Sequence, residues 1–502
     1  MLRSIVSNWA ALISLGLLSF LMTPFMIHRL GDLQFGLYTL AFSVVGFSEF
    51  IEMGIRSTLQ RFVGRLSGIK DREGLNAVFS TAVALTVTIG VVVIAFSWGL
   101  SGFLAAFFKL RSLDRSTFSW LVILLGLNVG AGLPAMLLQA YLSGLQRFDL
   151  QNLIAIIRQG LRSGLIVVVL LLGKGIIAVA GCALAGMVAV VPLNWWMLRR
   201  SDPGLRFSPH LANRTTAREL LGFSFWTLLN NAGQFLRDST DSVVIGRVLG
   251  SALITPFTVA SRLVDYFRPV IIGMVSPLLP RVSELEGQSR HNEIRQLFLR
   301  MTRLSALASL GVGSMLLLHG RTILLLWVGG RFVSSYGVLV LLTLGGVASL
   351  AQFGTLHTLI ALGRHRAYGI WTLGEGAANL ILSVIWARRY GIVGVALGTA
   401  VPLLAVKLTL QPLYVSRVLG MPAIQYLRKA LARPLAACTL FLGLCGPLCG
   451  FQANGSVWHV VGALAWQGAL FLALALFLGL DRGDRKLLGE RVKLVMRLVP
   501  AF

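Results

Sequence analysis

The sequence predicts an all-α polytopic membrane protein, and three of its properties lead to this fold class. Apolar stretches recur along the whole chain, which is 56% hydrophobic with a mean hydropathy of +0.79. Charged residues make up 13% of the chain, about half of the roughly 25% that is usual in soluble domains. Lysines and arginines gather in alternate short connections between the apolar stretches, as they do between transmembrane helices.

The apolar stretches are long enough to cross a bilayer, which takes about 20 helical residues. The first of them, Trp9 to Ile27, lacks the small-residue cleavage site of a secretory signal and is expected to be a span. Glycine and proline occur inside several stretches, which transmembrane helices tolerate. We expect about fourteen spans, at 8–28, 35–55, 76–107, 117–142, 151–173, 175–198, 219–246, 252–280, 304–328, 333–360, 367–387, 390–416, 430–451 and 457–480.

The positive charges predict the orientation in the membrane. If the N-terminus is cytoplasmic, lysine and arginine are about threefold more abundant in the cytoplasmic connections than in the external ones. Both termini are therefore expected in the cytoplasm. The formal net charge of +26 is explained by these connections and by attraction to anionic lipid headgroups. Nucleic acid is not an expected partner, because no basic soluble domain is present to bind it.

An internal repeat predicts the domain organisation. Leu30-Gly31 matches Leu249-Gly250, and Gly144 and Arg147 match Gly363 and Arg366 at the same offset of 219 residues. An even number of spans separates the copies, so they share one orientation, as in transporters built from parallel repeats. The expected parts are a six-helix N-lobe (1–200), a cytoplasmic linker (201–218), a six-helix C-lobe (219–418), two further spans (419–480) and a cytoplasmic amphipathic tail (481–502).

Two predicted spans carry polar and charged residues at helical spacing. One set falls at i, i+4, i+7 and i+11, and consists of Asn230, Gln234, Arg237 and Asp241. The other falls at i, i+3 and i+6, and consists of Arg262, Asp265 and Arg268. A charge in hydrocarbon costs about 3 kcal/mol on insertion scales, so such faces should look into a bundle interior or a wet cavity. The alternative is internal pairing, of Arg237 with Asp241 or of Asp265 with either neighbouring arginine.

A third basic face lies on the fifth predicted span. Arg158 and Arg162 are one helical turn apart, and their span contains no carboxylate with which they could pair. Because Arg158 is near the end of the span, snorkelling to the membrane surface is its alternative role. Carboxylates inside the bundle could hold a coupling proton or sodium ion or could be structural, and the candidates are Asp238, Asp241, Asp265 and Glu375.

Neither a catalytic site nor a metal site is expected. The seven histidines are scattered, and none is paired with a second ligand at metal-binding spacing. Cys438, Cys445 and Cys449 share a helical stripe without a histidine or carboxylate, which favours a role as small apolar filler. The chain has no GxxxxGK[ST] motif for a nucleotide. No cofactor is therefore predicted.

The start and the middle of the chain carry an ordered set of motifs. They are Asn8-Trp9, Pro24, LGDLQFGLYTL (30–40), FIEMGIRSTLQRFVGR (50–65), Asp241, Ile245-Gly246, Leu249-Gly250, Pro280 and Glu284. This set resembles the polysaccharide and oligosaccharide flippases of the multidrug/oligosaccharidyl-lipid/polysaccharide exporter superfamily. Glu52-Met53-Gly54 stands where that family usually has Asp-Leu-Gly, so this motif matches only in part. The resemblance covers nearly the whole chain.

The resemblance implies a V-shaped bundle of two lobes in a bacterial inner membrane. It also implies transfer of a polyprenyl-diphosphate-linked oligosaccharide to the external leaflet for surface polysaccharide assembly. The planar fork of arginine suits a diphosphate, and side-chain amides suit sugar hydroxyls. The candidate substrate-binding residues are Arg158, Arg162, Arg237, Arg262, Arg268, Asn230 and Gln234. Polysaccharide polymerase and chain-length proteins usually accompany such flippases and are the expected protein partners.

Two other functions compete with this one. A cation-coupled multidrug antiporter of the same superfamily should have an acidic, aromatic lumen, which the arginines inside the spans argue against. A membrane-bound glycosyltransferase or polymerase should have a large external loop, whereas the longest external connections here are roughly a dozen residues. A scaffold without transport activity is a more remote fourth function. The sequence thus favours a transporter and not an enzyme.

Overall fold

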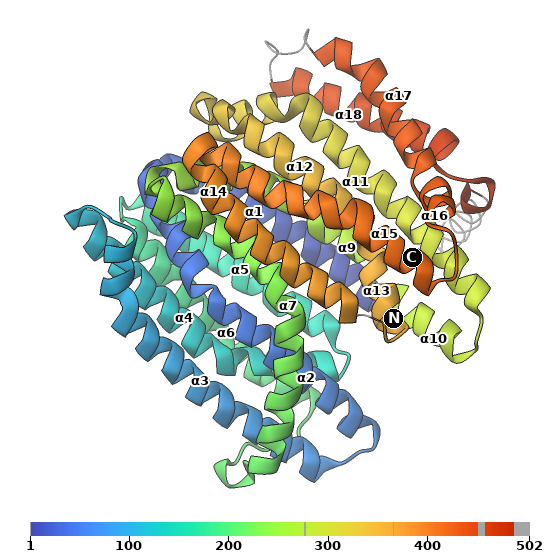
Figure 1. Ribbon diagram of the computed structural model, residues 1–502. Coiled ribbons are helices and arrows are strands. Elements are labelled where there is room, and N and C mark those ends of the chain that lie inside the picture. The colour runs from blue at the N-terminus through green and yellow to red at the C-terminus, as the bar shows by residue number, and fades with distance from the viewer. Residues whose placement is uncertain (1, 276–277, 365, 450–456, 486–502) are drawn as a thin grey trace. The chain divides into compact units, whose positions relative to one another are not determined.

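A computed structural model describes residues 2–275, 278–364, 366–449 and 457–485 (Figure 1). Within these ranges the chain is helical almost throughout and contains no β-strand. It divides into two compact units. The first consists of Met1–Thr258 with Ser383–Val395, and the second consists of Val259–Leu382 with Ala396–Phe502. The predicted all-α fold class is confirmed.

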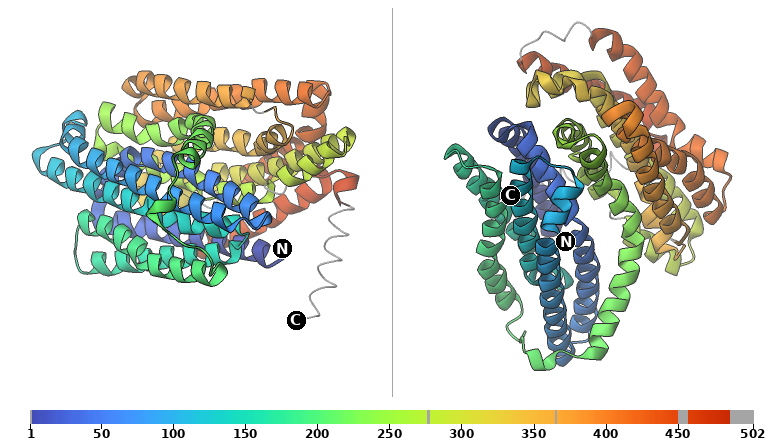
Figure 2. Two further views of the ribbon diagram at one scale, coloured as in Figure 1. Left: turned by 90° about the horizontal axis from the view of Figure 1, so that it is seen from below. Right: turned by 60° about the vertical axis from the view of Figure 1, so that its left-hand side comes forward.

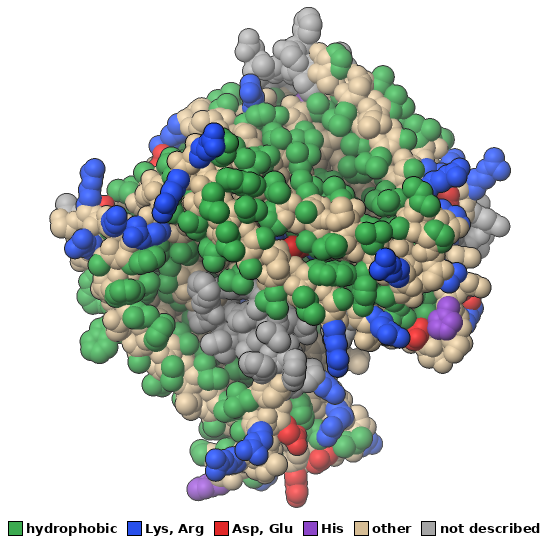
Figure 3. Space-filling view, viewed as in Figure 1, with side chains coloured by type: hydrophobic (Ala, Val, Ile, Leu, Met, Phe, Trp, Pro, Cys, Tyr) green, Lys and Arg blue, Asp and Glu red, His purple; other side chains and the backbone are tan. Residues whose placement is uncertain are grey.

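Many of the helices are long and apolar enough to cross a membrane. The described residues contain nine such helices, or ten if the bent pair α16 (Ala423–Ala430) and α17 (Ala432–Cys449) forms one span. Apolar side chains cover much of the face shown in Figure 3, as expected for a surface that contacts lipid. The predicted number of fourteen spans stays a prediction. Some single helices, such as α1, contain parts of two predicted spans, and other predicted spans carry too many charges to be counted by length and hydropathy.

The first unit is built mainly from seven long helices. They are α1 (Leu2–Val45), α2 (Phe47–Gly68), α3 (Arg72–Phe107), α4 (Ser112–Gly144), α5 (Phe148–Leu171), α6 (Ile176–Ser201) and α7 (Arg214–Val248). Two short 3₁₀ turns, Pro209–Leu211 and Ser251–Leu253, flank α7. The Asp71 side chain caps α3 by accepting a hydrogen bond of 2.9 Å from the Gly74 amide.

Small residues set the packing of α3 against α4, which run side by side (Figures 1 and 2). A Cβ atom added at Gly90 would lie 2.4 Å from the Gly130 carbonyl oxygen, and one added at Gly130 would lie 2.6 Å from the Gly90 oxygen. The two backbones therefore approach as closely as they do because neither residue has a side chain. Such contacts between small residues are a common way for helices to associate in membranes.

The two matched glycines of the predicted repeat have similar backbone conformations. Gly31 has φ 77° and ψ 168°, and Gly250 has φ 98° and ψ 156°. Residues with a Cβ atom rarely adopt such φ values. Gly31 interrupts α1 between the first and second predicted spans. This likeness supports the repeat, whereas the proposed lobe boundaries stay a prediction.

The second unit is built around the long helix α11 (His291–Val328). The others are the end of α8 (Ile254–Asp265), α9 (Arg268–Val275), α10 (Leu278–Gly287), α12 (Tyr336–Ala351), α13 (Phe353–Ala361), most of α14 (Arg366–Ala405), α15 (Gln411–Val418), α16, α17 and α18 (Val457–Leu474). A turn of π-helix, Val406–Leu410, joins α14 to α15, and another, Ala475–Gly479, follows α18. α17 and α18 lie side by side near the end of the chain (Figures 1 and 2).

Some predicted spans differ from the helices in the structure. The span expected at 35–55 is divided, because α1 ends at Val45 and α2 begins at Phe47. The span expected at 252–280 is broken into α8, α9 and the start of α10. The predicted amphipathic tail lies largely outside the described residues.

Candidate functional site

The first unit contains a cavity of about 370 Å³ among α1, α2, α4, α5 and α6. Small-molecule sites in proteins commonly have volumes of about 300–1,000 Å³. The polar side chains around the cavity are Arg56, Asn128, Gln139, Arg158, Gln159, Arg162 and Asn194. None of the lining residues that the structure describes is acidic. The cavity is therefore electropositive and rich in side-chain amides.

Arg162 is held at the cavity by contacts from two helices. Its Nη2 donates a hydrogen bond of 2.8 Å to the hydroxyl of Tyr38 on α1. On α6, a Cβ atom added at Gly186 would lie 3.3 Å from the Arg162 Cβ, so the glycine lets α5 approach closely. Arg158 lies one turn earlier on α5 and lines the same cavity. The predicted arginine pair therefore shares one cavity wall.

Two amide oxygens at the cavity lack a hydrogen-bond donor. Asn194 is 3% exposed, and its Nδ2 donates to the Val190 carbonyl oxygen at 3.0 Å. Its Oδ1 and the Oδ1 of Asn128 are buried and have no hydrogen-bond partner among the described residues. A buried acceptor without a donor costs about 1–3 kcal/mol. A ligand hydroxyl or a water would remove that cost.

The predicted face on α7 lies outside this cavity. Arg237 is buried, and its Nε lies 3.0 Å from Oδ1 of Asp238. Asp241 is buried one turn further on, and Gln234 is half-buried. The side chain of Asn230 lies outside the described part of the chain. The structure shows an ion pair of Arg237 with the adjacent Asp238, and the alternative pairing of Arg237 with Asp241 stays a prediction.

The second predicted set does not share one continuous helix. Arg262 and Asp265 lie on α8, which ends at Asp265, and Arg268 begins α9, so the common face of all three stays a prediction. Arg262 is half-buried in the last turn of α8, and its Nε has no hydrogen-bond partner among the described residues. Asp265 is exposed and Arg268 is half-buried. Their role in substrate binding stays a prediction.

Glu375 forms a buried ion pair in the second unit. Its Oε1 lies 3.0 Å from Nζ of Lys407, and the two side chains are 1% and 3% exposed. Lys407 also lies over the Tyr368 ring, 4.9 Å from its centroid. The Lys407 carbonyl, in the π-helical turn, accepts a hydrogen bond from Gln352. The pairing was not predicted, because Lys407 lies 32 residues from Glu375 in the sequence.

Arg56 is a cavity residue that the sequence reasoning missed. The second span was expected to end at residue 55, which placed Arg56 in a cytoplasmic connection. In the structure α2 continues to Gly68, and Arg56 lies on it beside the cavity. The amphipathic stretch at 50–65 was the signal that could have revealed the longer helix, since helical periodicity extends beyond the apolar window.

Comparison with known proteins assigns the chain to a family. A family model described as "Polysaccharide biosynthesis protein" matches residues 30–336, more than half of the chain. The chain belongs to the polysaccharide biosynthesis protein family. The resemblance expected from the sequence is thereby confirmed, and the matched range includes every residue that lines the cavity.

Individual relatives agree with this family membership. The chain is 24% identical to the uncharacterized membrane protein EpsK of Bacillus subtilis, over 88% of this chain and 87% of EpsK. It is 20% identical to a Shigella flexneri protein named "Putative O-antigen transporter", over 78% and 92% of the two chains. Its fold is similar to the inward closed conformation of the lipid II flippase MurJ, with a TM-score of 0.71, 15% identity and coverage of 95% and 98%. The present chain is therefore a multi-pass membrane protein with a transporter fold.

Proposed function

We propose that this protein flips a polyprenyl-diphosphate-linked oligosaccharide from the cytoplasmic to the external leaflet of a bacterial inner membrane. Transport proceeds by alternating access, and the oligosaccharide serves the assembly of a surface polysaccharide. Both termini are cytoplasmic in this proposal. The observation that carries it is the cavity of the first unit, in which three arginines and four side-chain amides surround one space without a described carboxylate.

The arginines match the charge of a diphosphate. Arg56, Arg158 and Arg162 come from two helices and line one cavity. Each guanidinium can donate two parallel hydrogen bonds to phosphate oxygens, and such bonds are stronger than neutral ones. The Tyr38 hydroxyl orients Arg162 without neutralising it. An anionic group entering the cavity would therefore meet three arginines, and none of the described residues that line the cavity is acidic.

The amides match a sugar. The unpartnered oxygens of Asn128 and Asn194 are acceptors, and sugar hydroxyls are donors. Gln139 and Gln159 add donors and acceptors at the same cavity. About 370 Å³ is enough for the diphosphate and the nearest sugar, but not for a long glycan and its tail. The remainder of the substrate would lie outside this cavity.

The family and the relatives support the same substrate class. The family is named for polysaccharide biosynthesis, one relative is named as an O-antigen transporter, and the neighbour of similar fold is a lipid II flippase. A polymerase and chain-length proteins would act on the flipped product. The multidrug antiporter is disfavoured, because organic cations would be repelled by three arginines. Phe42 is the only aromatic side chain among the described lining residues.

A reconstituted flipping assay tests the proposal. Proteoliposomes would carry a fluorescent polyprenyl-diphosphate disaccharide, and its transfer between leaflets would be followed by quenching. We expect Arg158→Ala/Arg162→Ala to reduce substrate affinity by about 10- to 100-fold, since each loses charge-assisted hydrogen bonds. The substrate affinity of Arg162→Lys should lie between those of the wild type and of Arg162→Ala, because lysine keeps the positive charge but lacks the planar guanidinium that forms two parallel hydrogen bonds.

The matched control is Arg111→Ala, which removes an exposed arginine at the start of α4 outside the cavity. It should flip substrate at the wild-type rate. Undiminished flipping by the double variant would refute the cavity as the diphosphate site. No flipping of any lipid-linked sugar by the wild type, together with proton-driven efflux of organic cations, would refute the proposed function itself.

A further inference from the structure

A second, larger cavity lies in the second unit, far along the chain from the proposed substrate site. It has a volume of about 1060 Å³ and is formed by α11, α16, the start of α17 and the segment 481–484. Its charged lining residues are Arg300, Arg303, Arg428, Lys429, Arg433, Arg482, Asp481 and Asp484. Six cations thus surround the space together with two carboxylates.

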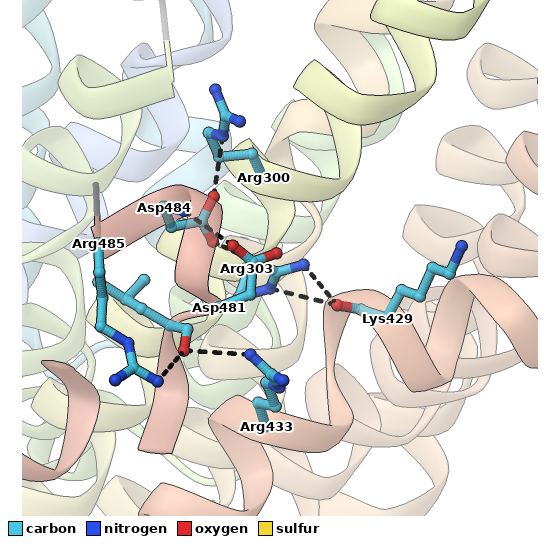
Figure 4. Close-up of polar contacts among 8 residues, drawn as sticks. Arg300, Arg303, Lys429, Arg433, Asp481, Asp484 and Arg485 are labelled. Carbon is cyan, nitrogen blue, oxygen red and sulfur yellow. Dashed lines mark hydrogen bonds and ion pairs between the residues drawn. The ribbon is translucent and has the colours of Figure 1, made fainter. Parts of the chain in front are cut away.

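The two carboxylates are already engaged by the arginines of α11 (Figure 4). Arg303 is buried and contacts both Asp481 and Asp484, and Arg300 Nε lies 2.8 Å from Oδ1 of Asp484. Arg303 also donates to the Lys429 carbonyl oxygen, with Nη2 at 2.9 Å. This network ties the segment after the last span to α11 and α16. Both carboxylates of the cavity lining are thus in contact with arginines of α11.

The remaining cations are Arg428, Lys429, Arg433 and Arg482. Among the described residues none of them forms a salt bridge with a carboxylate. Arg433 donates a hydrogen bond of 3.2 Å to the Leu480 carbonyl oxygen, and its charge helps to lower the pKa of Asp481. Like charges gathered at one cavity repel each other unless an anion lies between them. These cations come from two regions of the chain, the junction of α16 and α17 and the segment after the last span, and both regions line the same cavity.

The rim of the cavity shows which kind of anion fits. Ile424 lines it and is 75% exposed, and Leu299 is a second aliphatic side chain of the lining. α16 has a buried side with Tyr426 and an exposed side with Arg428 and Lys429. An amphipathic helix of this kind, next to a membrane span, lies at the level of lipid headgroups. A free phosphate ion would contact only the cations, whereas a phospholipid would contact both the cations and the exposed aliphatic side chain of Ile424.

We infer that this cavity binds the phosphate headgroup of an anionic phospholipid, with Arg428, Lys429 and Arg482 on the phosphate and Ile424 against an acyl chain. The site is separate from the proposed substrate cavity, and it does not depend on the flippase proposal. A bound lipid would lie against the segment that Asp481 and Asp484 anchor, and would hold the end of the last span in place.

Native mass spectrometry of the delipidated full-length protein tests the inference. Phosphatidylglycerol would be titrated against wild type, Arg428→Gln/Lys429→Gln and the control Arg388→Gln/Arg389→Gln, which removes an adjacent pair of exposed arginines on α14. Each cation near a membrane surface contributes about 1 kcal/mol to anionic lipid binding, so the first variant should bind about 30-fold more weakly. The control should bind as the wild type does.

Further titrations distinguish an anionic phospholipid from a zwitterionic phospholipid and from inorganic phosphate. Phosphatidylcholine should bind much more weakly than phosphatidylglycerol, and inorganic phosphate should not displace the bound lipid. Ile424→Gln should weaken lipid binding without changing the net charge. Arg482→Gln, on the exposed segment, provides a second test if the double variant elutes as aggregate.

Equal phosphatidylglycerol affinity in wild type and in the variants would overturn the inference. Equal binding of phosphatidylcholine would also overturn it, because the cations would then have no role in recognition. Displacement by inorganic phosphate at similar concentration would assign the cavity to a soluble anion instead of a lipid.

Discussion

Replacing Glu375 by glutamine should destabilise the second unit more than the loss of an ordinary ion pair would. Glu375 and Lys407 are 1% and 3% exposed and 3.0 Å apart. Glu375→Gln removes the carboxylate and leaves the ammonium of Lys407 buried beside the Tyr368 ring. Removing one partner of a buried pair typically costs about 3–5 kcal/mol, because the other charge is left uncompensated. We expect a loss of that size.

The double replacement distinguishes this explanation from a simple loss of contacts. Glu375→Gln/Lys407→Met removes both charges and keeps the side-chain volumes similar. Apolar replacement of a whole buried pair is often close to neutral. The double variant should therefore be more stable than Glu375→Gln alone, with a net cost of less than about 2 kcal/mol.

Unfolding in mixtures of detergent and sodium dodecyl sulfate would give the stabilities, with far-ultraviolet circular dichroism as the signal. The control is Glu284→Gln, which breaks an exposed pair in which Arg281 Nη1 lies 2.6 Å from Glu284 Oε2. That change should cost less than about 1 kcal/mol. A double variant no more stable than Glu375→Gln, or equal losses for Glu375→Gln and Glu284→Gln, would refute the argument from burial.

Two further changes test the packing and the acid response of the protein. Gly130→Ala places a Cβ 2.6 Å from a backbone oxygen of α3 and should cost about 1–3 kcal/mol in detergent unfolding, whereas Gly99→Ala, with nothing within 4 Å, should not destabilise. Burial raises the pKa of Asp481, but the Asp484 amide at 2.8 Å and Arg303 outweigh it, so the pKa lies below its usual 3.8. Asp481→Asn should therefore lower stability by less than about 1 kcal/mol above pH 4, and its difference from wild type should shrink as the pH falls through the folded pKa. A stable Gly130→Ala protein, or a difference for Asp481→Asn that grows in acid, would contradict these expectations.

Predictions that depend on local spacing agree best with the structure. Arg158 and Arg162 share a cavity wall because one helical turn separates them, and a helix formed there as expected. The common face of Arg262, Asp265 and Arg268 stays a prediction: Arg262 and Asp265 lie about one turn apart on α8, and a break in the helix separates them from Arg268 on α9. Hydropathy averages over a window and does not detect such a break.

The sequence by itself determined the all-α membrane fold, since hydrocarbon leaves backbone groups no partner outside a helix or a closed barrel. An ordered set of motifs also indicated the family, and a family model that matches residues 30–336 confirms it. Only the tertiary structure placed Arg56 beside the α5 arginines, Lys407 beside Glu375, and Arg303 beside Asp481. Each of these contacts joins residues far apart in the chain. Helical periodicity shows which residues share a face, but only the packing of one helix on another decides what that face meets.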